Sequence, residues 1–310
     1  MRISESPLKK QILKNMKLTR TFHPVGQGAF YTERFYDGDK NVFNMVYDCG
    51  SSTKSQYLKN EINDAFKDGT GKAEIDILFV SHFHNDHVNG IQELARQYHV
   101  QYLVFSSVLT KDKKPLYCEY LHNICYTQKI DNPANLLIER CFQDGVDYNS
   151  QEGNTLYFRD DKATVLLSSD NIDFGKLRNF SRLAWIYSPF CCINKPVNAK
   201  TILNDLTTQY PDLKNNLSFG QFFACIRDYF KDKHKIKELR ELYKPYYQND
   251  NYYSMTVMSK HTDPKYKDSS CLYTSDFQAR NSSYLKQLKN IIQMNGQIWP
   301  HYKSLTMDPE

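Results

Sequence analysis

Residues 75–87 read Ile-Asp-Ile-Leu-Phe-Val-Ser-His-Phe-His-Asn-Asp-His, and this stretch decides the fold. Its first six residues are mostly apolar, with β-branched and aromatic side chains, which predicts a buried strand over residues 75–80. Four polar groups directly after a buried strand are costly, so they indicate a metal site rather than a loop with coincidental histidines. These four groups are His82, His84, Asp86 and His87.

The spacing of these donors fits a metal site. In an extended segment, residues two positions apart project to one side, so His82 and His84 share a direction. A tight turn after them would bring Asp86 and His87 back to the same space. Imidazoles and carboxylates suit Zn²⁺ first, and Mn²⁺ and Fe²⁺ accept the same set. One ion would use three of the four donors, whereas two ions would need donors from elsewhere.

The sequence around this stretch predicts an α/β layer architecture. Three strands open the chain, with Asp37-Gly38 as a hairpin turn between the second and the third. Helices then alternate with strands, which is typical of α/β layers. The predicted strands are 17–23, 29–36, 41–47, 75–80 and 100–106, and the predicted helices are 54–66 and about 88–98.

The rest of the chain continues without a repeat or a linker, so we expect a single domain over residues 1–310. High lysine content and helical periodicity predict a helical insertion at about 195–248. The remaining predictions are mixed helical structure over 110–150, a hairpin over 154–168, strands at 252–259, 270–274 and 296–300, and a helix at about 280–294.

Residues 81–87 resemble the His-x-His-x-Asp-His motif of the metallo-β-lactamase superfamily, placed after a strand and before a helix as that fold requires. Residues 25–28, Val-Gly-Gln-Gly, and 46–50, Val-Tyr-Asp-Cys-Gly, resemble the opening of the branch that includes the β-lactamase-like domain of bacterial competence DNA-uptake (ComEC-type) proteins. The later motifs of that branch are Asn-x-x-Ser, Leu-x-Thr-Gly-Asp and Pro-His-His-Gly-Ser, and they resemble, in order, Asn251 to Ser254, Leu272 to Asp276 and Pro300 to Ser304.

The resemblance implies an αββα sandwich of two mixed sheets flanked by helices, and a metal-dependent hydrolase. Carried over residue by residue, it implies two metal ions that share Asp276. Asp48 would orient a ligating histidine, and with Asp86 it is a candidate for a catalytic role. The first ion would be bound by His82, His84 and Asp276, and the second by Asp86, His87, His301 and Asp276.

Plainer roles compete with some of these assignments. Asp48 could cap a helix or hold a turn, Asp276 could cap the helix that begins near residue 280, and His301 could be a surface histidine. Candidates on the substrate side are Asn251, Ser254 and Lys303, and the last either contacts a phosphate or is solvated.

Two departures from the family pattern bear on the site. No histidine between the main motif and Asp276 lies in an obvious matching strand, so the first ion is expected to lack one donor. Only nine residues follow His301, so the last elements of the fold are expected to be truncated, or completed by a partner protein or a second copy.

The substrate class is inferred from the net charge of the chain and from the family resemblance. The formal net charge of +5 gives mild support to an anionic substrate, and the resembled branch is associated with nucleic acid and phosphoesters. We therefore expect a phosphodiesterase or nuclease-type enzyme that uses a metal-bound hydroxide. The alternatives are a hydrolase of a thioester, lactone or lactam, and a catalytically silent metal-binding partner or regulatory subunit. Eight cysteines without a disulfide pattern, and no leader or membrane span, predict a cytoplasmic bacterial protein.

Overall fold

The structure is a computed structural model of the chain. In the described part of the chain, the larger sheet has seven strands: β1 (Met16–Phe22), β2 (Gly28–Asp37), β3 (Lys40–Ser51), β4 (Glu74–Val80), β5 (His99–Ser106), β6 (Thr155–Tyr157) and β7 (Thr164–Ser168). The structure describes residues 16–67, 74–106, 120–121, 123–124, 127–141, 155–157, 164–168, 185–191, 207–208, 211, 219–231, 233–243, 254–261 and 268–276.

The larger sheet is mixed, with the strand order β1-β2-β3-β4-β5-β7-β6. Strands β1, β2 and β3 form an antiparallel meander, and β3, β4, β5 and β7 run parallel. The predicted hairpin of β6 and β7 is confirmed by their antiparallel pairing. The sequence patterns therefore placed every strand of this sheet to within a few residues.

The smaller sheet contains β8 (Trp185–Cys191), β9 (Met255–His261) and β10 (Cys271–Tyr273) in the order β10-β9-β8. Within the described strands its pairs are antiparallel, so only the larger sheet is mixed. Strands β9 and β10 were predicted, whereas β8 was not. The predicted helix at 280–294 and strand at 296–300 lie outside the described residues.

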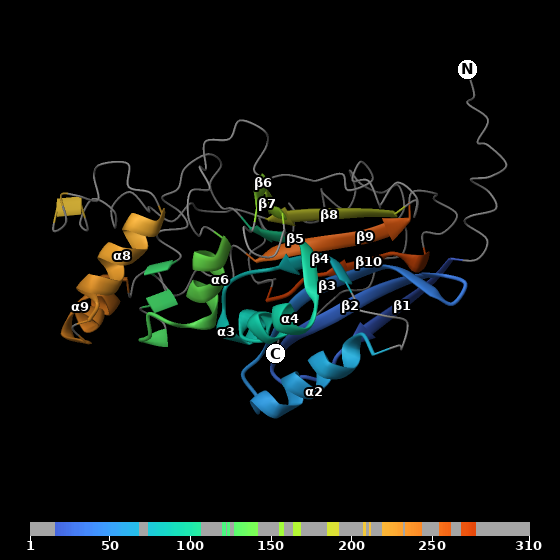
Figure 1. Cartoon of the computed structure of the whole chain (residues 1–310), viewed down its shortest axis with the longest axis horizontal. Coiled ribbons are helices and arrows are strands. Elements are labelled where there is room, and N and C mark those ends of the chain that lie inside the picture. Colours follow the sequence, from blue (N-terminus) through green and yellow to red (C-terminus); the bar gives the residue numbers. More distant parts are fainter. Residues whose placement is uncertain are drawn as a thin grey trace, which may run out of the picture.

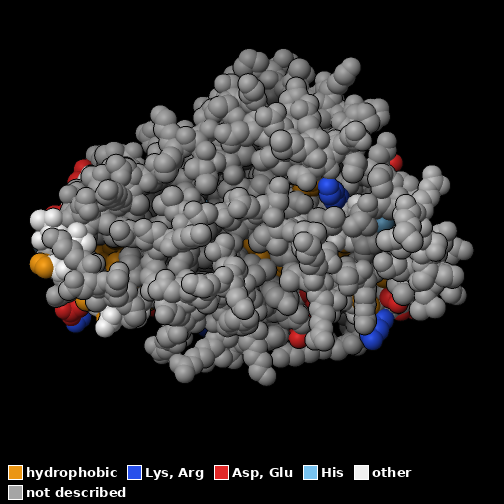
Figure 2. All heavy atoms as spheres, turned by 90° about the horizontal axis from the view of Figure 1, so that it is seen from above, with side chains coloured by type: hydrophobic (Ala, Val, Ile, Leu, Met, Phe, Trp, Pro, Cys, Tyr) orange, Lys and Arg blue, Asp and Glu red, His pale blue; other side chains and the backbone are white. Residues whose placement is uncertain are grey.

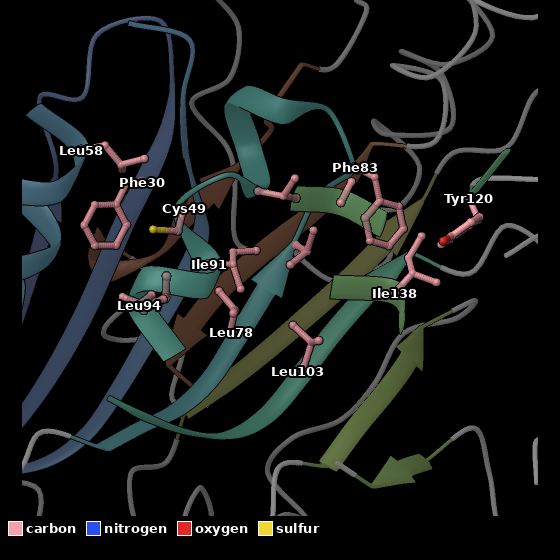
Figure 3. Packing of buried hydrophobic residues seen from close by; sticks show 14 of the residues in the cluster. Phe30, Cys49, Leu58, Leu78, Phe83, Ile91, Leu94, Leu103, Tyr120 and Ile138 are labelled. Carbon is pink, nitrogen blue, oxygen red and sulfur yellow. The ribbon is translucent and has the colours of Figure 1, made fainter. Parts of the chain in front are cut away.

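Two apolar clusters hold the layers together. One lies between the two sheets and includes Met45, Phe79 and Val257. The other lies on the opposite face of the larger sheet, under α2 (Ser55–Ala65), α3 (Asn85–Val88) and α4 (Ile91–Gln97), as Figures 1 and 3 show. The described core is therefore a helix layer on a large sheet on a small sheet, an α/β fold as predicted.

The predicted helix at 88–98 is divided in the structure. Helix α3 begins earlier than predicted, at Asn85, and a turn at Asn89 and Gly90 separates it from α4. The Gly90 N–H donates to the Cys49 carbonyl oxygen at 2.9 Å, and a Cβ at position 90 would lie 2.8 Å from Cys49 Sγ. The close contact with β3 is what separates the two helices.

Further helices lie beside this core: α6 (Pro133–Cys141), α8 (Phe219–Tyr229) and α9 (Lys233–Tyr243). Helices α8 and α9 fall within the segment predicted as a helical insertion. Arg227 of α8 donates to both carboxylate oxygens of Glu139 of α6 at 2.7 Å, and Glu139 also accepts from the Tyr120 hydroxyl. This network joins α8 to α6.

A buried carboxylate, Glu33 of β2, connects the two sheets. Its side chain is fully buried and accepts hydrogen bonds from both sides of the inter-sheet core. The donors are Arg20 Nε at 2.5 Å, the Tyr187 hydroxyl at 2.6 Å, Ser259 Oγ at 2.7 Å and the Tyr273 hydroxyl at 2.9 Å. One strand of the larger sheet is thus hydrogen-bonded to all three strands of the smaller one.

Asp76, at the start of β4, makes stability depend on pH. Burial raises the pKa of Asp76 to about 7, although its Oδ2 accepts from the Asn44 N–H at 2.7 Å. Because the folded-state pKa lies above the unfolded value, the folded state binds the extra proton, and stability falls as pH rises from about 4 to about 7. We expect the stability of Asp76→Asn relative to the native protein to increase by on the order of 2–3 kcal/mol between pH 5 and pH 8.

Urea unfolding at the two pH values measures this difference directly. Asparagine keeps an acceptor for the Asn44 N–H but carries no charge, so the titration of all other groups cancels in the comparison. A difference between the two proteins that is the same at both pH values would contradict the assignment.

None of the helices in the described part of the chain has the length and apolar character that a bilayer crossing needs. On the face shown in Figure 2, the charged side chains of the described residues are scattered and of both signs.

Candidate metal centre

The histidine motif directly follows β4 and lies at the carboxyl ends of the parallel strands of the larger sheet. Phe83 is 8% exposed and belongs to the apolar cluster under the helices, where Figure 3 shows it near Ile138. Because successive side chains of an extended segment alternate, a buried Phe83 directs its two neighbours, His82 and His84, away from that cluster. His84 then precedes the first turn of α3, which carries Asp86 and His87.

Three donor groups converge at this edge. His82, His87 and Asp276 each offer a ligand atom, and these atoms lie within 4.8 Å of one another. Asp276 Oδ1 is 3.4 Å from His87 Nε2, and Asp276 Oδ2 is 3.8 Å from His82 Nε2. Asp276 follows β10, so residues far apart in the sequence meet at this point.

These distances fit a shared cation. Two donors bound to a tetrahedral Zn²⁺ at about 2.0–2.1 Å lie roughly 3.4 Å apart. His82 Nε2 is buried and has no hydrogen-bond partner among the described residues, which is costly unless the atom binds something. An orphaned imidazole nitrogen that faces a carboxylate and a second imidazole is the donor set that a divalent metal takes.

The other predicted ligands lie near this group or beyond the described residues. Asp86 Oδ2 is 4.0 Å from His87 Nε2, and the His84 ring stands edge-on to the His82 ring with 4.4 Å between centroids. The structure thus groups His82 with His87, although the sequence analysis assigned them to different ions. His301, Lys303 and Asn251 lie outside the described residues, and Ser254 is described but its side chain is buried.

Asp48 lies behind His87. Its Oδ2 is 2.8 Å from His87 Nδ1, and the carboxylate is fully buried, so it acts on the site through the imidazole. A β-bulge explains its orientation: Phe30 pairs with Cys49 and Tyr31 with Tyr47, which leaves Asp48 unpaired with a φ of 56°. Bulges of this kind redirect a side chain next to a site.

The charges around His87 favour a cation. Burial opposes its imidazolium form, but the carboxylates of Asp48 and Asp276 outweigh burial and raise the pKa of His87 to about 10. The pKa of His82 is instead lowered well below its usual range, first by burial and then by the neighbouring His87 and His84. The hydrogen bond with His87 lowers the pKa of Asp276. The site therefore holds one positive charge readily and supplies one neutral imidazole nitrogen beside it.

The motif is also fixed through its backbone. The Met255 N–H at the start of β9 donates to the Ser81 carbonyl oxygen at 2.7 Å, and the Tyr47 hydroxyl donates to the Met255 carbonyl oxygen at 2.6 Å. The Asn89 side chain pairs with both backbone groups of Ser51, at 3.0 and 2.7 Å. Both sheets and the end of α3 thus hold the donor residues in place.

Two glycines let α3 lie against the larger sheet. A Cβ at Gly50 would lie 2.4 Å from the Asp86 carbonyl carbon and 2.5 Å from the His87 nitrogen, and one at Gly28 would lie 2.6 Å from the Asp86 carbonyl oxygen. These neighbours are backbone atoms, which cannot move without displacing Asp86 and His87. Glycine at these positions is therefore a condition for the observed geometry.

We expect Gly50→Ala to weaken Zn²⁺ binding by about 10–100-fold, because it would push two donor residues out of place, much as loss of a ligand's supporting contacts does. Isothermal titration with Zn²⁺ measures the change. Gly38→Ala is the matched control, since its Cβ would meet nothing within 4 Å and only its φ of 59° carries a cost, about 1 kcal/mol. Equal Zn²⁺ affinity in both variants would contradict this role of Gly50.

Residues 37–135 match the family model of the metallo-beta-lactamase superfamily. The match covers 99 of the 310 residues, which is less than half of the chain. The matched segment ends before Asp276, so the family model covers His82 to His87 but not the donor that joins them from β10. No curated protein matches the chain.

One solved structure that the chain resembles is MEM-A1, a subclass B3 metallo-beta-lactamase isolated from a soil metagenome library. The two share 13% identity, with a TM-score of 0.27. The alignment covers 59% of this chain and 51% of MEM-A1, so the chain spans about half the length of that protein.

Two residues at the centre, Ser81 and Ser275, were not predicted from the sequence. Ser81 Oγ lies 2.6 Å from Asp48 Oδ2 and 3.0 Å from His82 Nδ1, and Ser275 Oγ lies 2.7 Å from Ser81 Oγ. A signal for Ser275 existed, because serine stands where the Leu-x-Thr-Gly-Asp pattern has glycine. Ser81 carried no signal beyond its place before His82.

Proposed function

We propose that this chain is a metal-dependent hydrolase of phosphodiesters, such as a nuclease-type enzyme of the ComEC-like branch. The observation that carries the metal-dependent part is the convergence of His82, His87 and Asp276, in which the buried His82 Nε2 has no hydrogen-bond partner among the described residues. The match of residues 37–135 to the superfamily model supports the hydrolase class. The net charge of +5 and the branch motifs at Gly26, Gly28 and Asp48 support an anionic phosphodiester.

The residues of the chain divide the work in this proposal. His82, His87 and Asp276 would hold a divalent ion, with Asp86 and His84 as the nearest further donors and His301 as the donor from the last motif. The ion, when bound, supplies a Lewis acid that lowers the pKa of water and stabilises charge on a phosphoryl oxygen. Asp48 keeps the His87 ring oriented, and burial of His82 and His87 excludes water from their outer edges.

The test is hydrolysis of bis(p-nitrophenyl) phosphate by the full chain, before and after chelation and after reloading with Zn²⁺ or Mn²⁺. We expect activity to disappear on chelation and to return with one of the two metals. Elemental analysis of the purified protein gives the metal content independently.

Three outcomes would overturn parts of the proposal. Absence of stoichiometric divalent metal after reloading would remove the metal centre. Metal-dependent hydrolysis of a thioester, lactone or lactam with no phosphodiester hydrolysis would replace the substrate class. Full metal content with no hydrolysis of any of these substrates would indicate a silent metal-binding subunit.

A further inference from the structure

The hydroxyl groups of Ser275 and Ser81 are linked by hydrogen bonds next to the candidate metal centre. This series of hydrogen bonds ends at the buried carboxylate of Asp48. We propose that Ser81 is a positioning residue that holds His82 as the tautomer with its proton on Nδ1, and that Ser275 fixes the segment that carries Asp276. This inference rests on the proposed metal centre and names the residues that prepare it.

The direction of the hydrogen bonds follows from counting protons. The Asp48 carboxylate only accepts: its Oδ1 takes the Ser81 N–H at 2.7 Å, and its Oδ2 takes the Ser81 hydroxyl at 2.6 Å and the His87 Nδ1–H at 2.8 Å. The Ser81 hydroxyl has a single proton, so that proton is used on Asp48.

Ser81 Oγ must then accept from its other two neighbours. These are His82 Nδ1 at 3.0 Å and Ser275 Oγ at 2.7 Å. His82 therefore carries its proton on Nδ1 and presents a lone pair at Nε2, the buried atom that faces Asp276. The Asp48 carboxylate thus fixes the tautomer and orientation of both imidazoles, that of His87 directly and that of His82 through Ser81. A histidine that binds a metal needs such a hydrogen-bond partner on its other nitrogen.

Ser275 stands in a backbone conformation that serine seldom adopts. Its φ of 49° lies in the left-handed region, where a side chain costs of order 1–2 kcal/mol relative to glycine. Its hydroxyl contacts Ser81, and it lies 3.5 Å from both Asp48 Oδ2 and His87 Nδ1. A strained residue that is held by the site, and that directly precedes Asp276, favours a role in placing that carboxylate.

Substitutions of Ser81 and Ser275 test the role of each residue separately. Ser81→Ala removes the acceptor for His82 but keeps the backbone bonds to Asp48 and Met255, and Ser81→Thr keeps the hydroxyl. Ser275→Gly removes the hydroxyl and relieves the backbone strain but adds backbone freedom, so the loss that it shares with Ser275→Ala is the one that comes from the hydroxyl. Ser275→Ala removes the hydroxyl and keeps the strain.

The first measurement is the ¹⁵N spectrum of metal-free, ¹⁵N-histidine-labelled protein, which distinguishes the two imidazole tautomers; the signal of His82 is assigned by its loss in His82→Gln. We expect the Nδ1–H form in the native protein, Ser81→Thr and Ser275→Gly, and a mixture or the Nε2–H form in Ser81→Ala. The Nδ1–H form in Ser81→Ala would overturn the role of Ser81.

The second measurement is the affinity for Zn²⁺. We expect a loss of about 10–100-fold in Ser81→Ala and of about 10-fold in both Ser275 variants, with Ser81→Thr near the native value. Native affinity in Ser275→Gly would overturn the role of Ser275. If the native protein binds no Zn²⁺, the proposed metal centre and the role of Ser275 fail together, whereas the tautomer of His82 still decides the role of Ser81.

Discussion

His87→Ala should lose bound divalent metal and should lower phosphodiester hydrolysis by more than about 100-fold, since even the partners behind a metal ligand are worth about 10–100-fold. His87 lies close to three carboxylates of the described part of the centre. Its Nε2 lies 3.4 Å from Asp276 and 4.0 Å from Asp86, and its Nδ1 lies 2.8 Å from Asp48. Alanine would leave the buried Asp48 carboxylate without its imidazole partner, and Asp276 without its nearest one.

Metal content by elemental analysis and the rate of hydrolysis are the two readouts, with circular dichroism to show that the variant is folded. His234→Ala is the matched control, because His234 is an exposed histidine on α9, away from the motif. A folded His87→Ala protein that keeps stoichiometric metal would remove His87 from the ligand set.

Glu33→Ala should lower the free energy of unfolding by about 3–5 kcal/mol, the range for removing one partner of a buried ion pair. The carboxylate is fully buried and accepts from four donors that lie on both sheets. Alanine would leave the Arg20 guanidinium and the hydroxyls of Tyr187 and Tyr273 in the core without an acceptor. Burial is the largest cause of the raised pKa of both tyrosines and persists in the variant, so neither is expected to ionise to compensate.

Urea unfolding measures this loss. Glu33→Gln keeps the volume and one acceptor oxygen, so we expect a smaller loss of about 1–3 kcal/mol. Asp64→Ala is the surface control: Asp64 pairs with Lys67 at 2.8 Å, both side chains are largely exposed, and such pairs contribute about 0–1 kcal/mol. A Glu33→Ala loss no larger than that of Asp64→Ala would show that the buried network contributes little.

The larger sheet was predictable because its strands combine apolar runs with turn residues at their ends. The turn at Asp37-Gly38 marks the ends of β2 and β3, and the apolar run before Ser81 marks β4, so local pattern alone predicts three strands. Strand β8 was missed because Pro189 interrupts its sequence, and proline in a strand is tolerated only where the strand needs no N–H at that position, as on an edge. That position in the sheet is a property of the whole fold and is absent from the local sequence.

The candidate site was predictable where metal donors cluster in sequence, and less so where hydrogen bonds support them. His82, His87 and Asp276 were named from motifs, and the structure brings them together. Ser81 and Ser275 were not named, because serine is common in turns and only the meeting of β4 with β10 shows what their hydroxyls contact. The division of α3 from α4 likewise depends on a contact with β3 that no helical periodicity records.

The three-residue strand β10 places Asp276 beside donors from the N-terminal third of the chain. A cation bound there would act as a removable cross-link between segments that are far apart in sequence. Because the unfolded chain cannot keep these donors together, metal binding would add to the stability of the folded state by mass action. The folding and metal-binding equilibria would then be coupled, and the melting temperature of the protein would rise with the concentration of free metal.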